Sequence, residues 1–208
     1  MRDFDSLIVE FDKALRTVFG DPAGERPSPG LAVPDTELSS DEKSGVAALM
    51  RVNHCGEICA QALYQGQALV ARTESTRELL LQAAQEECDH LAWCQQRLDD
   101  LGGSRSVLNP LWYAGSFGLG VASGMLGDKW SMAFLVETER QVERHLDDHL
   151  TQLPESDLKS RKVLEAMRDD EIRHGDRGEQ QGAVPMPQAM KLAMRIMSRL
   201  MTRTAYWI

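Results

Sequence analysis

The chain has 208 residues and a net charge of −9, so it can bury a sizeable core but is too acidic for a general phosphate-binding surface, which argues against nucleic acid as a partner. Hydrophobic residues make up 42% and charged residues 26%, which is typical of a globular protein. The cysteines form no CxxC pair, and we expect reduced, mostly buried thiols rather than a disulfide framework or a zinc site. These cysteines are Cys55, Cys59, Cys88 and Cys94.

The first segment, residues 1–19, has the pattern of an amphipathic helix. Acidic residues interrupt each of its apolar runs, unlike a signal peptide. Its predicted apolar face consists of Phe4, Leu7, Ile8, Phe11, Ala14, Leu15 and Val18. Residues 20–38 are rich in glycine and proline and are expected to form a surface loop.

Helices are expected to fill most of the remaining chain. Ser39 and Glu42 have the spacing of a capping box, and the glycines at 102 and 103 would end a later helix. Strand-like alternation is not evident, so the predicted class is all-α, as one domain with a helical bundle over 40–182. The expected helices cover about 39–72, 76–101, 128–151, 156–179 and 187–204.

An uncharged insert, "SVLNPLWYAGSFGLGVASGMLG", occupies residues 106–127. Its length would allow a bilayer crossing, but its proline, asparagine and five glycines make it a poor spanning helix. We expect a short apolar helix that faces a membrane surface or lines an apolar pocket. The alternatives are a buried structural helix and a true transmembrane helix.

Each of four predicted helices carries a glutamate in the middle of its apolar stripe. Burying an unpaired carboxylate costs several kcal/mol or more, so four such residues predict a bound cation. In the third of these helices Glu137 points away from the stripe and Glu143 lies at its edge, which favours Glu139. The four residues are Glu57, Glu87, Glu139 and Glu171.

Two histidines complete the pattern. His90 follows Glu87 by three residues, and His174 follows Glu171 by three, so each pair shares one helix face. One glutamate from each of two helices with Glu-x-x-His from each of the other two is the ligand set of ferritin-like di-iron or di-manganese bundles. Four carboxylates and two imidazoles therefore predict a site for two divalent ions, iron or manganese.

These segments also resemble the demethoxyubiquinone hydroxylases, the di-iron enzymes of ubiquinone biosynthesis. "RVNHCGEICAQALYQGQ" at 51–67 is similar to the signature helix of that family, and the resemblance extends over about residues 40–208. Cys55 and Ile58 depart from the usual small and aromatic residues, and neither is a predicted ligand. The further matching segments, in order, are "EECDHL", "PLWYAGSFGLG", "VETERQVERHL" and "DDEIRHGD".

The resemblance implies a ferritin-like monooxygenase that hydroxylates the ring of a prenylated demethoxyubiquinol. It implies two ferrous ions per chain, O₂ as co-substrate, and electrons from NADH or from the quinol itself. Other ubiquinone-biosynthesis proteins are potential partners. The family's metal residues correspond to the six residues named above, which would act in catalysis through the metals.

Three further residues are candidates for a supporting role near the metals. His54 precedes Glu57 by three residues and is more consistent with a hydrogen-bonding role than with ligation. Tyr64 shares the face of Glu57 and is expected to pack near the site rather than to carry a radical. His145 could assist electron or proton entry, whereas His149 is expected to be solvated.

The last predicted segment, residues 187–208, has a basic stripe and an apolar stripe, which is typical of a helix at a membrane interface. The alternative is a bundle helix with its methionines in the core. Together with 106–127, it predicts a peripheral protein on the cytoplasmic face of a bacterial cell membrane. The basic stripe is Lys191, Arg195, Arg199 and Arg203, and the apolar stripe is Met186, Met190, Met194, Met197 and Met201.

Two other functions share the predicted ligands. A ferritin-type iron-binding or detoxification protein would need polar outer faces, which the uncharged insert does not provide. A di-iron hydroxylase of another substrate, such as a tRNA base, does not match the acidic charge. The sequence thus favours the quinol hydroxylase.

Overall fold

The computed structural model describes residues 4–208, and within that range it contains seven α-helices, one short 3-10 helix and no strand. The predicted all-α class is therefore confirmed. Residues 1–3 of the expected first helix lie outside the described part. The α-helices are α1 (Phe4–Phe19), α2 (Ser40–Val70), α3 (Glu74–Asp100), α4 (Asn109–Met125), α5 (Asp128–Gln152), α6 (Leu158–Gln180) and α7 (Gln188–Trp207), and the 3-10 helix is Pro29–Ala32.

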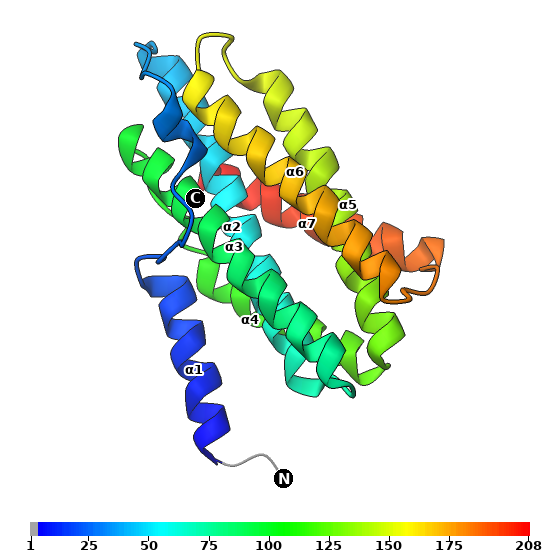
Figure 1. The fold of residues 1–208 in the computed structure, drawn as a ribbon. Helices are drawn as coiled ribbons and strands as arrows, with labels where there is room; N and C mark the ends of the chain where they lie inside the picture. Colours follow the sequence, from blue (N-terminus) through cyan, green and yellow to red (C-terminus); the bar gives the residue numbers. More distant parts are fainter. Residues whose placement is uncertain (1–3) are drawn as a thin grey trace.

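Helices α2, α3, α5 and α6 form a bundle, in which α2 pairs with α3 and α5 pairs with α6 (Figure 1). Local chemistry sets the helix limits. The Ser39 hydroxyl accepts a bond from the Glu42 amide, and the Glu42 carboxylate accepts one from the Ser39 amide, as the capping box predicts. After α3, Gly102 has a φ of 69°, a left-handed conformation that glycine adopts without strain.

The two largest apolar clusters of the core have a polar layer between them. One cluster lies where α2 and α6 begin and α3 and α5 end, around Met50, Leu98 and Leu164. The other lies at the opposite end of the bundle, around Leu80 and Leu135. The predicted glutamates and histidines lie between these clusters, so the apolar side chains enclose them on both sides along the bundle axis.

The insert forms α4, which packs along α2. Its glycines permit this close approach: a Cβ on Gly120 would lie 2.2 Å from the Leu63 carbonyl oxygen, and a Cβ on Gly66 of α2 would lie 2.4 Å from the Phe117 carbonyl oxygen. The glycines therefore serve helix packing, a role that the sequence reasoning did not assign to them. The opposite side of α4 remains exposed at Leu111 and Met125.

Helices α1 and α7 lie outside the bundle (Figure 1), and the C-terminal part of α1 packs on its side, where Val18 contacts the cluster of Ile58 and Ala62 in the middle part of α2. On α1, Ile8, Phe11 and Leu15 are exposed while Val18 is buried; the side chains of Phe4 and Leu7, predicted for the same face, lie outside the described part. Among residues 4–208, no helix combines the length and the apolar character that a membrane crossing requires.

The methionine stripe of α7 mostly faces the bundle, as in the alternative interpretation. Met190 and Met194 pack against the cluster around Phe134, and Met201 packs against the cluster around Cys55. Met197 is exposed. The outward apolar row of α7 is a different one, and it consists of Leu192, Ile196, Leu200, Trp207 and Ile208.

Candidate metal centre

The structure brings the six predicted ligands together in the polar layer, each at most 3% exposed. Their donor atoms form two groups, each with all its atoms within 4.8 Å of one another. Glu87 and Glu171 belong to both groups, so two ions could share them. The first group also has Glu57 and His90, and the second has Glu139 and His174.

His90 has an inward and an outward nitrogen. Its Nδ1 lies 2.8 Å from Oε2 of Glu87, 3.3 Å from Oε1 of Glu171 and 3.7 Å from Oε2 of Glu57. Its Nε2 lies 2.8 Å from Oδ2 of Asp170. A neutral imidazole that donates its Nε2 hydrogen to Asp170 directs the Nδ1 lone pair at the three other carboxylates, which is the orientation of a metal ligand.

His174 repeats this arrangement. Its Nε2 lies 2.6 Å from Oε2 of Glu86. Its Nδ1 lies 3.4 Å from Oε1 of Glu87 and 3.6 Å from the nearer oxygens of Glu139 and Glu171. Both histidines therefore present Nδ1 to the shared carboxylates and Nε2 to an outer acid.

The hydrogen bonding of the cluster fits a pair of cations. Among the described residues, Oε1 of Glu87, Oε2 of Glu139, both carboxylate oxygens of Glu171 and Nδ1 of His174 are buried without a hydrogen-bond partner. Buried polar atoms are nearly always satisfied, so these atoms are suited to ligation. Within the described chain, the four carboxylates form ion pairs only with His90 and His174 and with no lysine or arginine.

Without metal ions, the carboxylates and histidines of the cluster have shifted pKa values. Burial raises the pKa of Glu57 and that of Glu139 well above the ordinary range. Burial opposes ionisation of Glu87 too, but His90 and His174 together outweigh it and lower the pKa of Glu87. Burial likewise disfavours protonation of His90, but the carboxylates of Glu87, Glu171 and Glu57 together reverse this and raise the pKa of His90. Such groups exchange protons for metal ions, because ligands bind in their deprotonated form.

Sequence reasoning missed the two outer acids, Glu86 and Asp170, because it attended to Glu-x-x-His alone. Each immediately precedes the glutamate of that motif, and each bonds to the histidine of the other motif. The pattern acid-Glu-x-x-His occurs in both helices and was the signal available. The bond to His174, followed by one to Arg177, lowers the pKa of Glu86 to about 2, so this carboxylate stays ionised.

The three residues expected to support the site lie in different surroundings. The Tyr64 hydroxyl donates to Oε1 of Glu139, inside the polar layer. His54 is buried, and its ring nitrogens have no partner among the described residues. The His145 ring lies against the His149 ring, with 3.9 Å between centroids and 58° between the ring planes. His149 is 5% exposed, so its expected solvation is wrong.

The competing glutamate of α5 faces elsewhere. Glu137 pairs with Lys191 of α7 at 3.0 Å and accepts a hydrogen bond from Gln141. Its carboxylate therefore ties α5 to α7, in agreement with the prediction that it points away from the site. Lys191, counted in the basic stripe of the last helix, is consequently engaged by the bundle.

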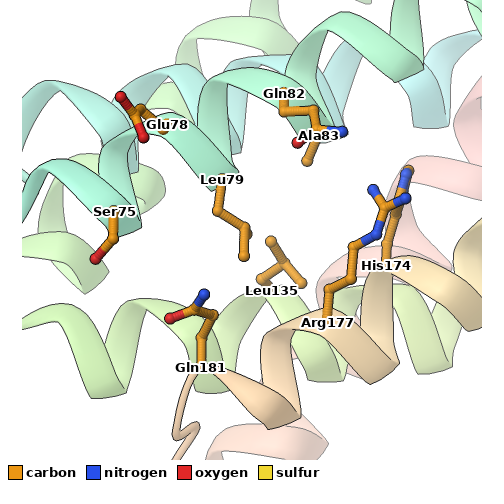
Figure 2. Close-up of a pocket in the computed structure, with 9 residues that line it drawn as sticks. All are labelled: Ser75, Glu78, Leu79, Gln82, Ala83, Leu135, His174, Arg177 and Gln181. Atoms are coloured by element: carbon orange, nitrogen blue, oxygen red, sulfur yellow. The ribbon is translucent and has the colours of Figure 1, made fainter.

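A pocket of about 280 Å³ lies between α3, α5 and α6 beside this centre, with Leu79, Ala83 and Leu135 as its apolar lining (Figure 2). Of the six residues of the cluster, only His174 lines it. At this side the Glu86 carboxylate bonds to both Nη1 of Arg177 and Nε2 of His174. The pocket therefore approaches the centre without exposing its carboxylates.

Comparison with known proteins gives consistent results. The family model described as ubiquinone biosynthesis protein COQ7 matches residues 44–205. A 3-demethoxyubiquinol 3-hydroxylase of Dechloromonas aromatica is 55% identical over 97% of this chain and 98% of its own. A protein of the same name from Nitrosomonas eutropha is 54% identical over the full length of both chains. A third, from Xanthomonas axonopodis pv. citri, is 54% identical over 97% of this chain and 93% of its own.

Proposed function

The chain belongs to the COQ7 family of ubiquinone biosynthesis proteins, and we propose that it is a 3-demethoxyubiquinol 3-hydroxylase that uses two iron ions and O₂. The observation that carries this proposal is the buried layer of four carboxylates and two imidazoles, in a chain that matches hydroxylases over its whole length. The net reaction places one oxygen atom of O₂ on the quinol ring and releases the other as water. It therefore consumes two electrons and two protons beyond the substrate, with NADH or the quinol as the proposed source of electrons.

Six residues of this chain would hold the ions. Glu57 and His90 would bind one ion, Glu139 and His174 the other, and the remaining pair, Glu87 and Glu171, both. Four carboxylates balance the charge of two divalent cations, and the mixture of oxygen and imidazole ligands suits iron. When bound, the iron ions would supply the activation of O₂ that the organic groups of the protein cannot provide.

The residues around the six ligands would orient their side chains and exclude water from them. Asp170 and Glu86 accept the Nε2 hydrogens of the two histidines, which fixes the tautomer that leaves Nδ1 free. Tyr64 holds one oxygen of Glu139. The apolar clusters on either side keep water away from the layer, which strengthens the charge interactions within it.

A prenylated substrate also suggests contact with a membrane, and three exposed apolar surfaces support peripheral binding. One is on α1, one on α4, and one on the outer side of α7. On α7 the row of Leu192, Ile196 and Leu200 runs beside the exposed Arg195 and Arg199, a combination that suits anionic lipid headgroups. We propose that 106–127 and 187–208 contact the membrane, on the cytoplasmic face of a bacterial cell membrane.

The catalytic proposal is tested with anaerobically iron-loaded protein and a demethoxyubiquinol. The wild type should contain two iron ions per chain and form hydroxylated product only with O₂ and a reductant. Glu171→Ala should lose both properties, because Glu171 belongs to both groups. Asp176→Ala is the matched control, an exposed acid of the same helix outside the cluster, and it should retain both. Two ions without product would exclude the hydroxylase, and no bound metal would exclude the centre.

The membrane proposal is tested by sedimentation with vesicles that contain anionic lipid. The double variant Ile196→Ser with Leu200→Ser should bind vesicles at least about tenfold more weakly, because it removes two exposed apolar side chains from α7. Leu158→Ser with Ile172→Ser removes a comparable exposed pair from α6 and serves as the control. Equal loss in both variants, or none in the first, would contradict the proposed role of α7.

A further inference from the structure

The loop between α1 and α2 is fastened over the middle of α3. At Gly24 it approaches so closely that a Cβ there would lie 3.1 Å from both the Ala92 Cβ and Oδ1 of Asp89. The next two backbone amides, of Glu25 and Arg26, donate to the same Oδ1 at 2.5 and 3.1 Å. Asp89 adjoins His90 in sequence, so this attachment lies directly beside the candidate metal centre.

The side chain of Arg26 extends the attachment from α3 to α6. Its Nε donates to Oδ2 of Asp89, and its Nη1 lies 2.8 Å from Oδ2 of Asp170. The guanidinium also lies over the Trp93 ring, 4.8 Å from its centroid, while the Trp93 indole N–H donates to the Arg26 carbonyl oxygen at 3.1 Å. The planar fork of an arginine can bond two carboxylates and stack at once, which fixes its position.

Two of the residues that Arg26 contacts, Asp170 and Trp93, also lie next to His90. Oδ2 of Asp170 contacts both Nη1 of Arg26 and Nε2 of His90, each at 2.8 Å. Trp93, beneath the guanidinium, lies 5.3 Å from the His90 ring between centroids. Asp170, which orients His90, is therefore itself held by a residue of the loop. The side chain of Asp170 is 4% exposed and that of His90 is 0% exposed, whereas the Arg26 side chain is 40% exposed.

The other histidine has no such connection to the loop. Its outer acid, Glu86, bonds to Arg177, which lies on α6 one turn after His174 itself. The two sides of the centre are thus supported differently. Glu86 is held by bundle helices alone. Asp170 accepts a bond at Oδ1 from Arg173 of its own helix, but its Oδ2, which contacts His90, is held by Arg26, a residue outside the bundle.

We infer that Arg26 is a positioning residue for the His90 side of the metal centre, acting through Asp170. The inference rests on the proposed function, since it assumes that His90 ligates an ion. It adds that the loop 20–38 controls the affinity of the centre for one of the two ions and does not change its affinity for the other. Loss of the guanidinium removes the loop partner of Oδ2 and leaves Arg173, at Oδ1, as the remaining cationic partner of Asp170. The imidazole of His90 is then held less firmly in its tautomer and direction.

The test is a titration of the full-length chain with Co²⁺ alone, followed by visible absorption and equilibrium dialysis. Arg26→Gln should weaken one of the two stepwise dissociation constants by about 10- to 100-fold, the range for loss of an outer hydrogen bond at a metal site. The second constant should change less than about twofold, and the Co²⁺ absorption of the weakened site should shift. Arg26→Lys keeps the charge but not the planar guanidinium, and its weakened dissociation constant should lie between those of the wild type and Arg26→Gln. If Arg26→Gln fails to fold, the same titration is made with Arg26→Lys.

Arg105→Gln is the matched control. Arg105 holds the start of the same loop, with Nη1 2.8 Å from the Gly20 carbonyl oxygen and Nη2 3.1 Å from Oδ1 of Asp21, and it contacts no outer acid. This variant loosens the loop and should bind both ions as the wild type does. Wild-type affinities in Arg26→Gln, or equal weakening of both ions, would overturn the inference and leave the centre intact. Failure of the wild type to bind two ions would instead overturn the proposed centre, and the inference with it.

Discussion

Oδ2 of Asp170 lies 2.8 Å from Nε2 of His90, although the two residues are eighty positions apart in the chain and on different helices. Asp170 thus adjoins one predicted ligand, Glu171, in sequence and supports another in space. Glu86 has the same double relationship, next to Glu87 and bonded to His174. The two Glu-x-x-His helices therefore hold each other's imidazoles, and α3 and α6 support the centre as a reciprocal pair.

This reciprocity predicts that the two outer acids affect different ions. Asp170→Asn should weaken the ion bound by His90, and Glu86→Gln the ion bound by His174, each by about 10- to 100-fold, because each loses the charged acceptor that fixes one histidine. Stepwise metal titration measures both constants. Asp169→Asn and Glu78→Gln alter exposed acids of the same two helices and should have no effect. If each outer variant weakened both ions equally, the assignment of one acid to one ion would be wrong.

The variant Tyr64→Phe distinguishes a packing role of Tyr64 from a role as a redox-active radical. The Tyr64 side chain is fully buried, and its hydroxyl donates to Glu139. Loss of that donor leaves a buried carboxylate oxygen unpaired, so the free energy of unfolding of the metal-free chain should fall by about 1–3 kcal/mol in denaturant titrations. The metal-loaded variant should still bind two ions and turn over within about tenfold of the wild type. A total loss of turnover with intact metal binding would instead indicate the radical role that the sequence also allows.

The bundle and its six polar residues could be predicted because both follow from helical periodicity. A glutamate such as Glu57 interrupts an apolar stripe in a way that only a buried charge partner explains, and the stripe itself places that glutamate in the interior of the bundle. The position of Glu139 followed from the same argument. These predictions used the residue pattern along one face of each helix and required no knowledge of how the helices are connected.

The residues that were missed lie where periodicity gives no information. Arg26 belongs to a glycine- and proline-rich loop, and nothing in the loop sequence indicates that it reaches Asp170 across α3. His149 was expected in solvent, but it is buried and its ring lies against that of His145. The glycines of α4 were interpreted only as unfavourable for a membrane-spanning helix, whereas the contact with α2 requires them at 120, next to the Leu63 backbone, and at 124, next to the Val70 side chain.

The α4 contact predicts opposite effects for two glycines of one helix. Gly120→Ala would put a Cβ 2.2 Å from the Leu63 carbonyl oxygen, so the helices must separate, and the free energy of unfolding should fall by about 1–3 kcal/mol. At Gly118 nothing lies within 4 Å of an added Cβ, and Gly118→Ala should raise that free energy by up to about 1 kcal/mol through helix propensity. Denaturant titrations of both variants measure this difference. Similar values for the two would mean that α4 does not pack on α2 through Gly120.

The burial of His149 against His145 predicts an acid-dependent loss of stability. Burial, assisted by the neighbouring His145, lowers the pKa of His149 from 6.5 to about 3. The unfolded chain therefore binds a proton below pH 6.5 that the folded chain refuses until about pH 3. The stabilising contribution of the neutral ring is present above pH 6.5 and is lost as the pH falls towards 3, at up to about 1.4 kcal/mol per pH unit.

His149→Gln should remove that slope, because glutamine does not titrate. In chelator-treated protein, the free energy of unfolding of the wild type should decline more steeply between about pH 6.5 and pH 4 than that of the variant, by up to one proton's contribution. The variant, less stable at neutral pH through lost ring packing, should therefore approach the wild type on acidification. Parallel curves would show that His149 is protonated in the folded chain, which is incompatible with its burial against His145.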